Sequence, residues 1–196
     1  MKLIKNILPI LCMVTVCSLL SCSSSKKNTG TKSSNRVSND AVPKLITRTS
    51  TKNIPARSIN TKNVSADEFV KFAETLVGIN YKYGSADIKK GFDCSGYITY
   101  VFNHFGIKVP RSSAEFTNAG KTIDPMESKP GDLVLFTGTD TTGWTVGHMG
   151  IIAENDHGRI TFLHSASGGG KGVMLSSMNS YFIPRFVKVI RVFPIK

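Results

Sequence analysis

The chain has 196 residues, enough for one folded domain with additional segments, and a formal net charge of +12 at pH 7. The charge is uneven, because residues 23–63 hold nine Lys or Arg against one acidic residue, whereas residues 64–196 hold fourteen against twelve. The nearly neutral C-terminal part lacks the basic footprint of nucleic-acid-binding domains, so that class is excluded and we expect no nucleic-acid partner.

Residues 1–21 are predicted to be a lipoprotein signal peptide. Lys2 and Lys5 precede a mostly apolar run over residues 7–20, which is too short for a comfortable membrane span. The Leu-Leu-Ser-Cys sequence that ends at Cys22 resembles a bacterial lipobox, where cleavage precedes a cysteine that becomes lipidated. An ordinary signal peptide cut nearby is the alternative, and either one takes the chain out of the cytoplasm.

Residues 22–63 are predicted to be a lipidated cysteine followed by a basic, disordered tether. The segment is rich in Ser, Thr, Asn and Lys and shows no apolar periodicity. We therefore expect the protein in the bacterial cell envelope, lipid-anchored to a membrane. If the organism has two membranes, the serine after Cys22 is compatible with the periplasmic face of the outer membrane.

Residues 64–196 are predicted to form a single domain that starts with helices. Ser65 and Glu68 have the spacing of a capping box, and the apolar positions that follow repeat at helical spacing up to Gly78. A second helix is expected over residues 94–105 with Asp93 as its N-cap. A short third helix is expected over residues 112–120.

The pattern then changes to strands, which we expect at residues 133–136, 148–153, 160–165 and 186–193. Residues 155–158, Asn-Asp-His-Gly, are typical of a hairpin turn between the middle two. Helices followed by a run of strands joined by short loops indicate an α+β domain around an antiparallel sheet.

Cys94 is the one cysteine that remains after the leader and the lipid attachment site at Cys22. It follows Asp93 in the first turn of the second predicted helix, where unpaired N–H groups favour an anion. Asp93 opposes a thiolate, so a reactive Cys94 would need a histidine base. The alternative is a packed, unreactive thiol.

Two histidines are candidates for that base. His148 begins one strand of the predicted hairpin and His164 ends the other, so both should emerge near the same end of the sheet. One could then act as the base and the other could orient it. Unrelated strand-end histidines, or a zinc site with Cys94, are the alternatives. We predict no metal, because a zinc site here would lack any local ligand spacing. We predict no cofactor, because residues 167–172 lack the strand and helix context of a phosphate loop.

Seven blocks of this sequence together resemble the NlpC family of bacterial cell-wall cysteine peptidases, distant relatives of papain. In order they are NYKYGS, GFDCSGYITYVF, VPRSS, KPGDLVLF, VGHMGI, FLHSAS and GVMLSSMNSYF. The resemblance covers roughly residues 66–193. It implies a papain-like fold with N-terminal helices packed on a mainly antiparallel sheet.

The resemblance also implies roles for single residues. Cys94 would be the nucleophile, His148 the base and His164 the residue that orients it. Tyr81 would line the site close to the oxyanion, with Tyr83 as the second match in a loop one residue longer than usual. Asp93 and Ser95 match positions associated with holding the amino terminus of the substrate peptide. Arg111 matches a recurrent Pro-Arg-Ser and would have a structural role or lie at the rim of the site.

The implied activity is that of a lipoprotein murein endopeptidase, which cleaves D-glutamyl–diamino acid bonds in peptidoglycan stem peptides. An amidase or acyltransferase on the same scaffold and a non-catalytic wall-binding module are the alternatives. The partners expected are peptidoglycan and the membrane that holds the lipid, with the protein acting as a monomer. The loop at residues 138–147, which carries Trp144, would be a wall of the substrate groove or a packed loop.

Overall fold

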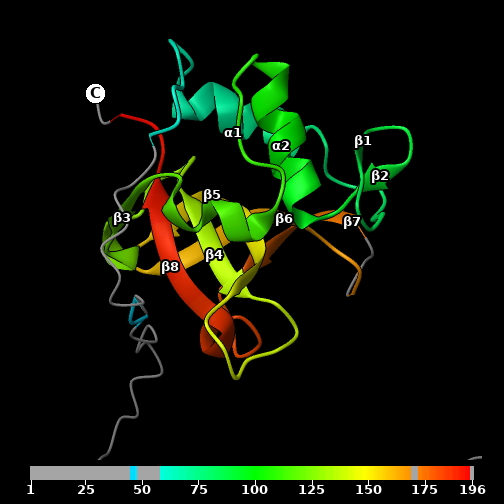
Figure 1. Cartoon of the computed structure of the whole chain (residues 1–196). Helices are drawn as coiled ribbons and strands as arrows, with labels where there is room; N and C mark the ends of the chain where they lie inside the picture. The colour runs from blue at the N-terminus through cyan, green and yellow to red at the C-terminus, as the bar shows by residue number, and fades with distance from the viewer. Residues whose placement is uncertain (1–44, 48–57, 169–171, 195–196) are drawn as a thin grey trace, which may run out of the picture. The chain divides into compact units, whose positions relative to one another are not determined.

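The computed structural model describes residues 45–47, 58–168 and 172–194 of the chain (Figure 1). The predicted leader, the lipid attachment site Cys22 and most of the predicted tether lie outside the described residues. Within the described part, no helix has both the length and the apolar character that a membrane crossing requires.

Two α-helices begin at the N-caps that the sequence predicts, and the first ends at Glu74, four residues before the expected stop at Gly78. Helix α1 spans Ala66–Glu74 and opens on a capping box, in which the Glu68 amide donates to Ser65 Oγ and the Ser65 amide to the Glu68 carboxylate. Helix α2 spans Cys94–His104, and its Gly96 amide donates to Asp93 Oδ1 over 2.6 Å. Both N-caps predicted from the sequence are therefore confirmed.

The strands form one six-stranded antiparallel sheet in the order β3-β8-β4-β5-β6-β7. Its members, in chain order, are β3 (Lys121–Ile123), β4 (Leu133–Thr137), β5 (Val146–Asp156), β6 (Arg159–Ala166), β7 (Gly172–Ser177) and β8 (Phe186–Arg191). A separate two-stranded ribbon pairs β1 (Ala86–Asp87) with β2 (Gly91–Phe92) just before α2.

Helices α1 and α2 lie on one side of the sheet, above it in Figure 1. The larger apolar core lies between these helices and the sheet, and includes Phe69 from α1, Phe102 from α2 and Leu135 from β4, all fully buried. A smaller core on the opposite face is built largely from phenylalanines, among them Phe136 and Phe162. The domain is thus the α+β arrangement expected, with helices packed on an antiparallel sheet.

The structure differs from the sequence-based expectation in its shorter elements. Residues 113–118 form a 3₁₀-helix, Ser113–Asn118, in place of the expected third helix. Two further one-turn 3₁₀-helices occur at Pro125–Glu127 and Ile183–Arg185. Strand β7 was not predicted, because its alternating exposure at the sheet edge follows directly on a glycine-rich stretch. Strand β3 has only three residues, too few for a periodic signal.

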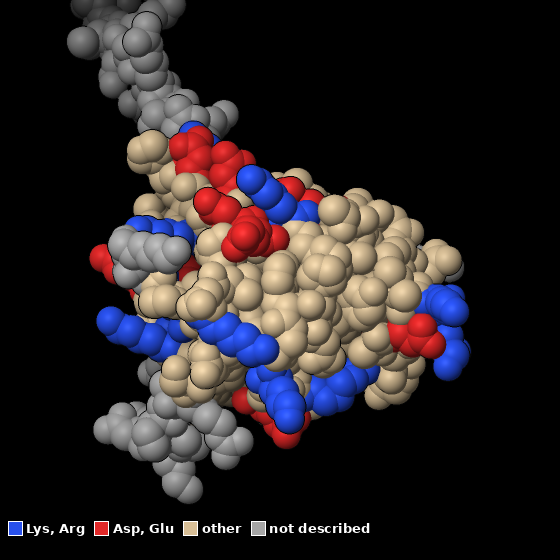
Figure 2. Space-filling view, turned by 90° about the horizontal axis from the view of Figure 1, so that it is seen from above, with Lys and Arg blue, Asp and Glu red and all other residues tan. Residues whose placement is uncertain are grey.

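Charged side chains of both signs surround a broad uncharged area on the face seen from the helical side (Figure 2). Acidic side chains gather toward the upper left of this view and basic ones along its lower edge (Figure 2). The picture agrees with the nearly neutral composition of residues 64–196.

Candidate active site

Cys94 occupies the first position of α2 and is a free, partly buried thiol. This position places Cys94 next to the sheet, where its Sγ lies 3.8 Å from the carbonyl oxygen of Gly147, the residue that precedes His148. Burial and the neighbouring Asp93 carboxylate raise the pKa of the thiol, whereas the backbone amides at the helix start and Arg111 lower it by less. The net direction is upward, so the resting thiol is protonated near neutral pH.

His148 and His164 meet because β5 and β6 form the hairpin predicted around residues 155–158. The pairing closes at Asp156 and Arg159, with both residues of the turn at positive φ, as a type I′ turn requires. The two imidazoles lie edge to face, and His148 Nε2 is 2.9 Å from His164 Nδ1. The expectation that both emerge at the same end of the sheet is confirmed.

A third member extends this pair. His164 is only 2% exposed, and its Nε2 lies 2.8 Å from Ser176 Oγ on β7. Sequence reasoning missed Ser176 because β7 itself was not predicted. The two serines are adjacent in the sequence Leu-Ser-Ser-Met, so polarity does not alternate there and gives no strand signal.

Burial sets the protonation of both histidines. It lowers the pKa of His148 to about 4, and burial together with repulsion from His148 lowers the pKa of His164 to about 3. Both rings are neutral at pH 7. One consistent arrangement has His148 Nε2–H donating to His164 Nδ1, and His164 Nε2–H donating to Ser176 Oγ. His148 Nδ1 is then left as a proton acceptor, which is what a general base requires.

Asp93 is held in a buried network on the other side of Cys94. Its carboxylate receives two hydrogen bonds from the Arg111 guanidinium, over 3.1 and 2.7 Å, in addition to the Gly96 amide. Ser95 Oγ lies 3.3 Å from the same carboxylate and accepts from Arg111 over 3.0 Å. Asp93 and Ser95 are 8% and 5% exposed, so a substrate-binding role for them stays a prediction.

Cys94, His148 and His164 line one cavity of about 520 Å³. Tyr81 also lines it, while Tyr83 is 85% exposed and lies outside the lining. Burial and the nearby Cys94 raise the pKa of the Tyr81 phenol, so this group keeps a proton that it can donate. Of the two tyrosines considered, only Tyr81 is placed to contact a reacting group.

Gly138, at the start of the loop between β4 and β5, and Gly147, the second residue of β5, both line this cavity. These glycines touch, since a Cβ on Gly147 would lie 2.7 Å from the Gly138 backbone. Trp144, farther along the loop, is 47% exposed and does not line the cavity.

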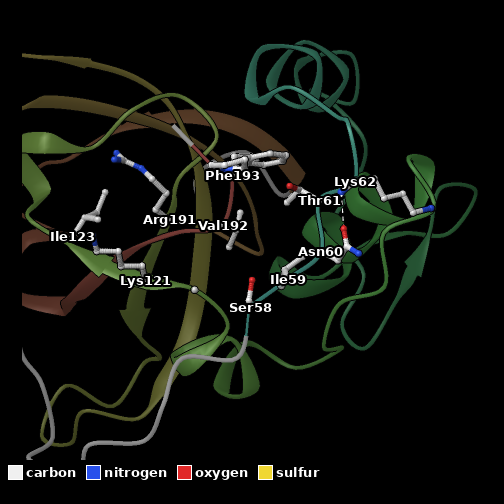
Figure 3. Close-up of a pocket in the computed structure, with 12 residues that line it drawn as sticks. Ser58, Ile59, Asn60, Thr61, Lys62, Lys121, Ile123, Arg191, Val192 and Phe193 are labelled. Atoms are coloured by element: carbon white, nitrogen blue, oxygen red, sulfur yellow. Dashed lines mark hydrogen bonds between the residues drawn. The ribbon is translucent and has the colours of Figure 1, made fainter. Parts of the chain in front are cut away.

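A larger hollow of about 760 Å³ lies elsewhere, between residues 58–62 and strands β3 and β8 (Figure 3). It contains no cysteine or histidine, and its arginine, Arg191, is bound bidentately by Asp132. It therefore holds no cysteine–histidine pair of the kind found in the first cavity. No three His, Cys, Asp or Glu side chains in the described ranges are grouped as a metal site would require.

Comparisons with known proteins agree with this geometry. Residues 78–191 match the sequence model of the NlpC/P60 family. The chain is 40% identical over 102 residues to the gamma-DL-glutamyl hydrolase of Bacillus subtilis, covering 51% of this chain and 24% of that protein. It is 33% identical over 138 residues to the murein DD-endopeptidase MepS/murein LD-carboxypeptidase of Escherichia coli, covering 69% and 65%. The chain thus spans less than two thirds of either relative.

Solved structures show the same fold. The peptidoglycan hydrolase RipB of Mycobacterium tuberculosis superposes with a TM-score of 0.54 at 26% identity, over 69% of this chain and 72% of that one. A lipoprotein-like NLP/P60 protein of Staphylococcus aureus superposes with a TM-score of 0.57 at 25% identity, over 74% and 46%.

Proposed function

This chain belongs to the NlpC/P60 family, and we propose that it is a cysteine endopeptidase that hydrolyses amide bonds in the stem peptides of peptidoglycan. The observation that carries the proposal is the convergence of Cys94 and the His148–His164–Ser176 chain on one cavity. A nucleophile, a base and a group that orients the base are the parts that acyl transfer needs.

In the mechanism, His148 Nδ1 takes the proton of the Cys94 thiol as the sulfur attacks the scissile carbonyl carbon. The oxyanion is stabilised by the backbone N–H of Cys94, at the start of α2, and by the phenol of Tyr81. The tetrahedral intermediate collapses to a thioester when His148 returns the proton to the leaving amine. Water, deprotonated by His148, then attacks the thioester and releases the acid and the free thiol. His164 keeps the imidazole in the required tautomer throughout.

Burial raises the pKa of the Cys94 thiol and lowers that of His148. Both groups are neutral at rest, so proton transfer accompanies the attack instead of preceding it. No step requires a metal or a cofactor.

We propose the D-glutamyl–diamino acid bond as the scissile bond. The relative named gamma-DL-glutamyl hydrolase and a second relative in Bacillus subtilis named bifunctional muramidase/DL-endopeptidase support it. The relative named murein DD-endopeptidase MepS supports a second candidate, the D-alanyl–diamino acid cross-link. Mass spectrometry of digested muropeptides separates the two: fragments ending in D-glutamate support the first, and intact stems released from dimers support the second.

We also propose that the protein acts in the cell envelope as a monomer anchored through a lipid on Cys22. The support is the lipobox-like sequence at residues 19–22 and the basic segment that follows it. Metabolic labelling with a fatty acid tests the anchor: the wild-type protein should be labelled and a Cys22→Ala variant should not. Labelling of neither protein would refute it. Sedimentation equilibrium of the soluble domain tests the monomer: the mass of one chain is expected, and the mass of two would refute it.

A further inference from the structure

Arg185 is an arginine in the wall of the active-site cavity that the mechanism leaves unused. It ends the 3₁₀-helix Ile183–Arg185 and is held from two sides. Its guanidinium carbon lies 3.9 Å from the centre of the Tyr181 ring, and its Nη1 donates to the Tyr181 carbonyl oxygen over 2.7 Å. These contacts fix the plane of the guanidinium at the cavity wall.

This guanidinium has no acidic partner in the described part of the chain. The other three arginines described there, Arg111, Arg159 and Arg191, each form an ion pair with an aspartate. Arg185 forms none, and its Nε is a buried nitrogen without a hydrogen-bond partner. A positioned guanidinium with unused donors in a ligand cavity is suited to a carboxylate that comes with the ligand.

The position of Arg185 indicates which half of the substrate carries that carboxylate. Tyr181 packs edge to face on Phe182, and the Phe182 ring stacks on that of His148, with centroids 6.4 Å apart. Arg185 therefore belongs to the histidine side of the cavity, whereas Asp93 and Arg111 lie on the side of α2. In the proposed mechanism His148 protonates the leaving amine, so the leaving half of the substrate lies on the histidine side.

We propose that Arg185, oriented by Tyr181, binds a carboxylate of the diamino acid whose amine leaves, and thereby selects diaminopimelate-type stems. This inference rests on the proposed function. Diaminopimelate carries a carboxylate at each end. Lysine lacks the second carboxylate, and amidation of diaminopimelate removes the charge of that carboxylate. Both candidate scissile bonds release an amine of this same diamino acid, so the inference holds for either bond. A planar guanidinium can bind such a group through two parallel N–H donors, which a lysine cannot do.

The test uses a matched pair of synthetic cross-linked stem-peptide dimers, which contain both candidate bonds, one with diaminopimelate and one with its side-chain carboxylate converted to a carboxamide. The ratio of kcat/KM for the two substrates is measured for wild type, Arg185→Gln and Arg185→Lys, with Arg159→Gln as an exposed-arginine control. Wild type should prefer the acid by about 10- to 100-fold, the range expected for one charge-assisted contact. Arg185→Gln should bring the ratio to within about 2-fold by slowing cleavage of the acid alone, and Arg185→Lys should fall between.

The outcomes are distinguishable. If wild type cleaves both peptides equally well, the carboxylate is not recognised and the inference is wrong, while the proposed function stands. If Arg185→Gln slows both substrates by the same factor, Arg185 has a structural role and the inference is again wrong. If wild type cleaves neither peptide, both the function and the inference fail. Should Arg185→Gln not fold, the ratio for Arg185→Lys decides, because that variant keeps a cation at the site.

Discussion

Replacing Arg111 with methionine should destabilise the domain by leaving a buried carboxylate without its counterion. Asp93 has a side chain that is 12% exposed, and Arg111 supplies two of its hydrogen bonds as well as the opposing charge. Methionine keeps much of the apolar stem of arginine and removes only the guanidinium. Asp93 would keep its bond from the Gly96 amide but lose its charge compensation.

The structure sets the size of the effect. Removing one partner of a fully buried ion pair costs roughly 3–5 kcal/mol, and removing one of an exposed pair about 0–1 kcal/mol. Arg111 is 43% exposed, so water can partly replace it. We expect a loss of about 2 kcal/mol, which is roughly a 30-fold change in the unfolding equilibrium.

Urea unfolding of a double-mutant cycle measures this directly. Asp93→Asn keeps an oxygen that caps α2 but removes the charge that Arg111 neutralises. In the Asp93→Asn background, Arg111→Met should therefore lower the free energy of unfolding by about 1–2 kcal/mol less than it does in the wild type. Equal losses in both backgrounds would refute the reasoning, because Arg111 would then contribute through packing alone.

Three further predictions concern protonation, the orientation of the base and a second ion pair. Because the pKa of His148 is lowered to about 4 and that of His164 to about 3, the unfolded state takes up protons first as the pH falls below 6.5. The stability that the neutral histidines contribute is therefore full above pH 6.5 and is lost towards pH 4. The urea midpoint should fall over that window, and it should fall less steeply in His148→Gln. Equal slopes for the two proteins would contradict this. Ser176→Ala should lower kcat roughly 5-fold with little change in KM, since it removes the 2.8 Å contact to His164, whereas the exposed neighbour Ser177→Ala should have no effect. Asp132→Ala should cost about 3 kcal/mol by urea unfolding, because the Arg191 and Asp132 side chains are only 13% and 3% exposed. Asp87→Ala, which breaks an exposed pair with Lys90, should leave the urea midpoint nearly unchanged.

The features that sequence reasoning predicted are those fixed by neighbouring residues. The capping box at Ser65, the cap at Asp93 and the turn at residues 155–158 each depend on four or fewer consecutive positions. The approach of His148 to His164 followed from the short turn that joins β5 and β6, although a register shift between Ile152 and Glu154 lies between that turn and the histidines.

The features that were missed depend on contacts between distant segments. Ser176 reaches His164 only because β7 pairs with β6, and β7 carries no strong strand signal of its own. A role for Arg185 becomes visible only beside Tyr181 and the cavity. Asp93 and Arg111, which form an ion pair, lie 18 positions apart in the sequence. No periodicity or capping rule encodes such partners.

The central claim is that Cys94 is the nucleophile of a peptidoglycan endopeptidase. The most direct measurement is mass spectrometry of muropeptides released from purified sacculi by wild type and by Cys94→Ala, with matched folding verified by circular dichroism. We predict that wild type releases new fragments cut at a diamino acid amine and that Cys94→Ala releases none. Equal release by the two proteins would contradict the claim.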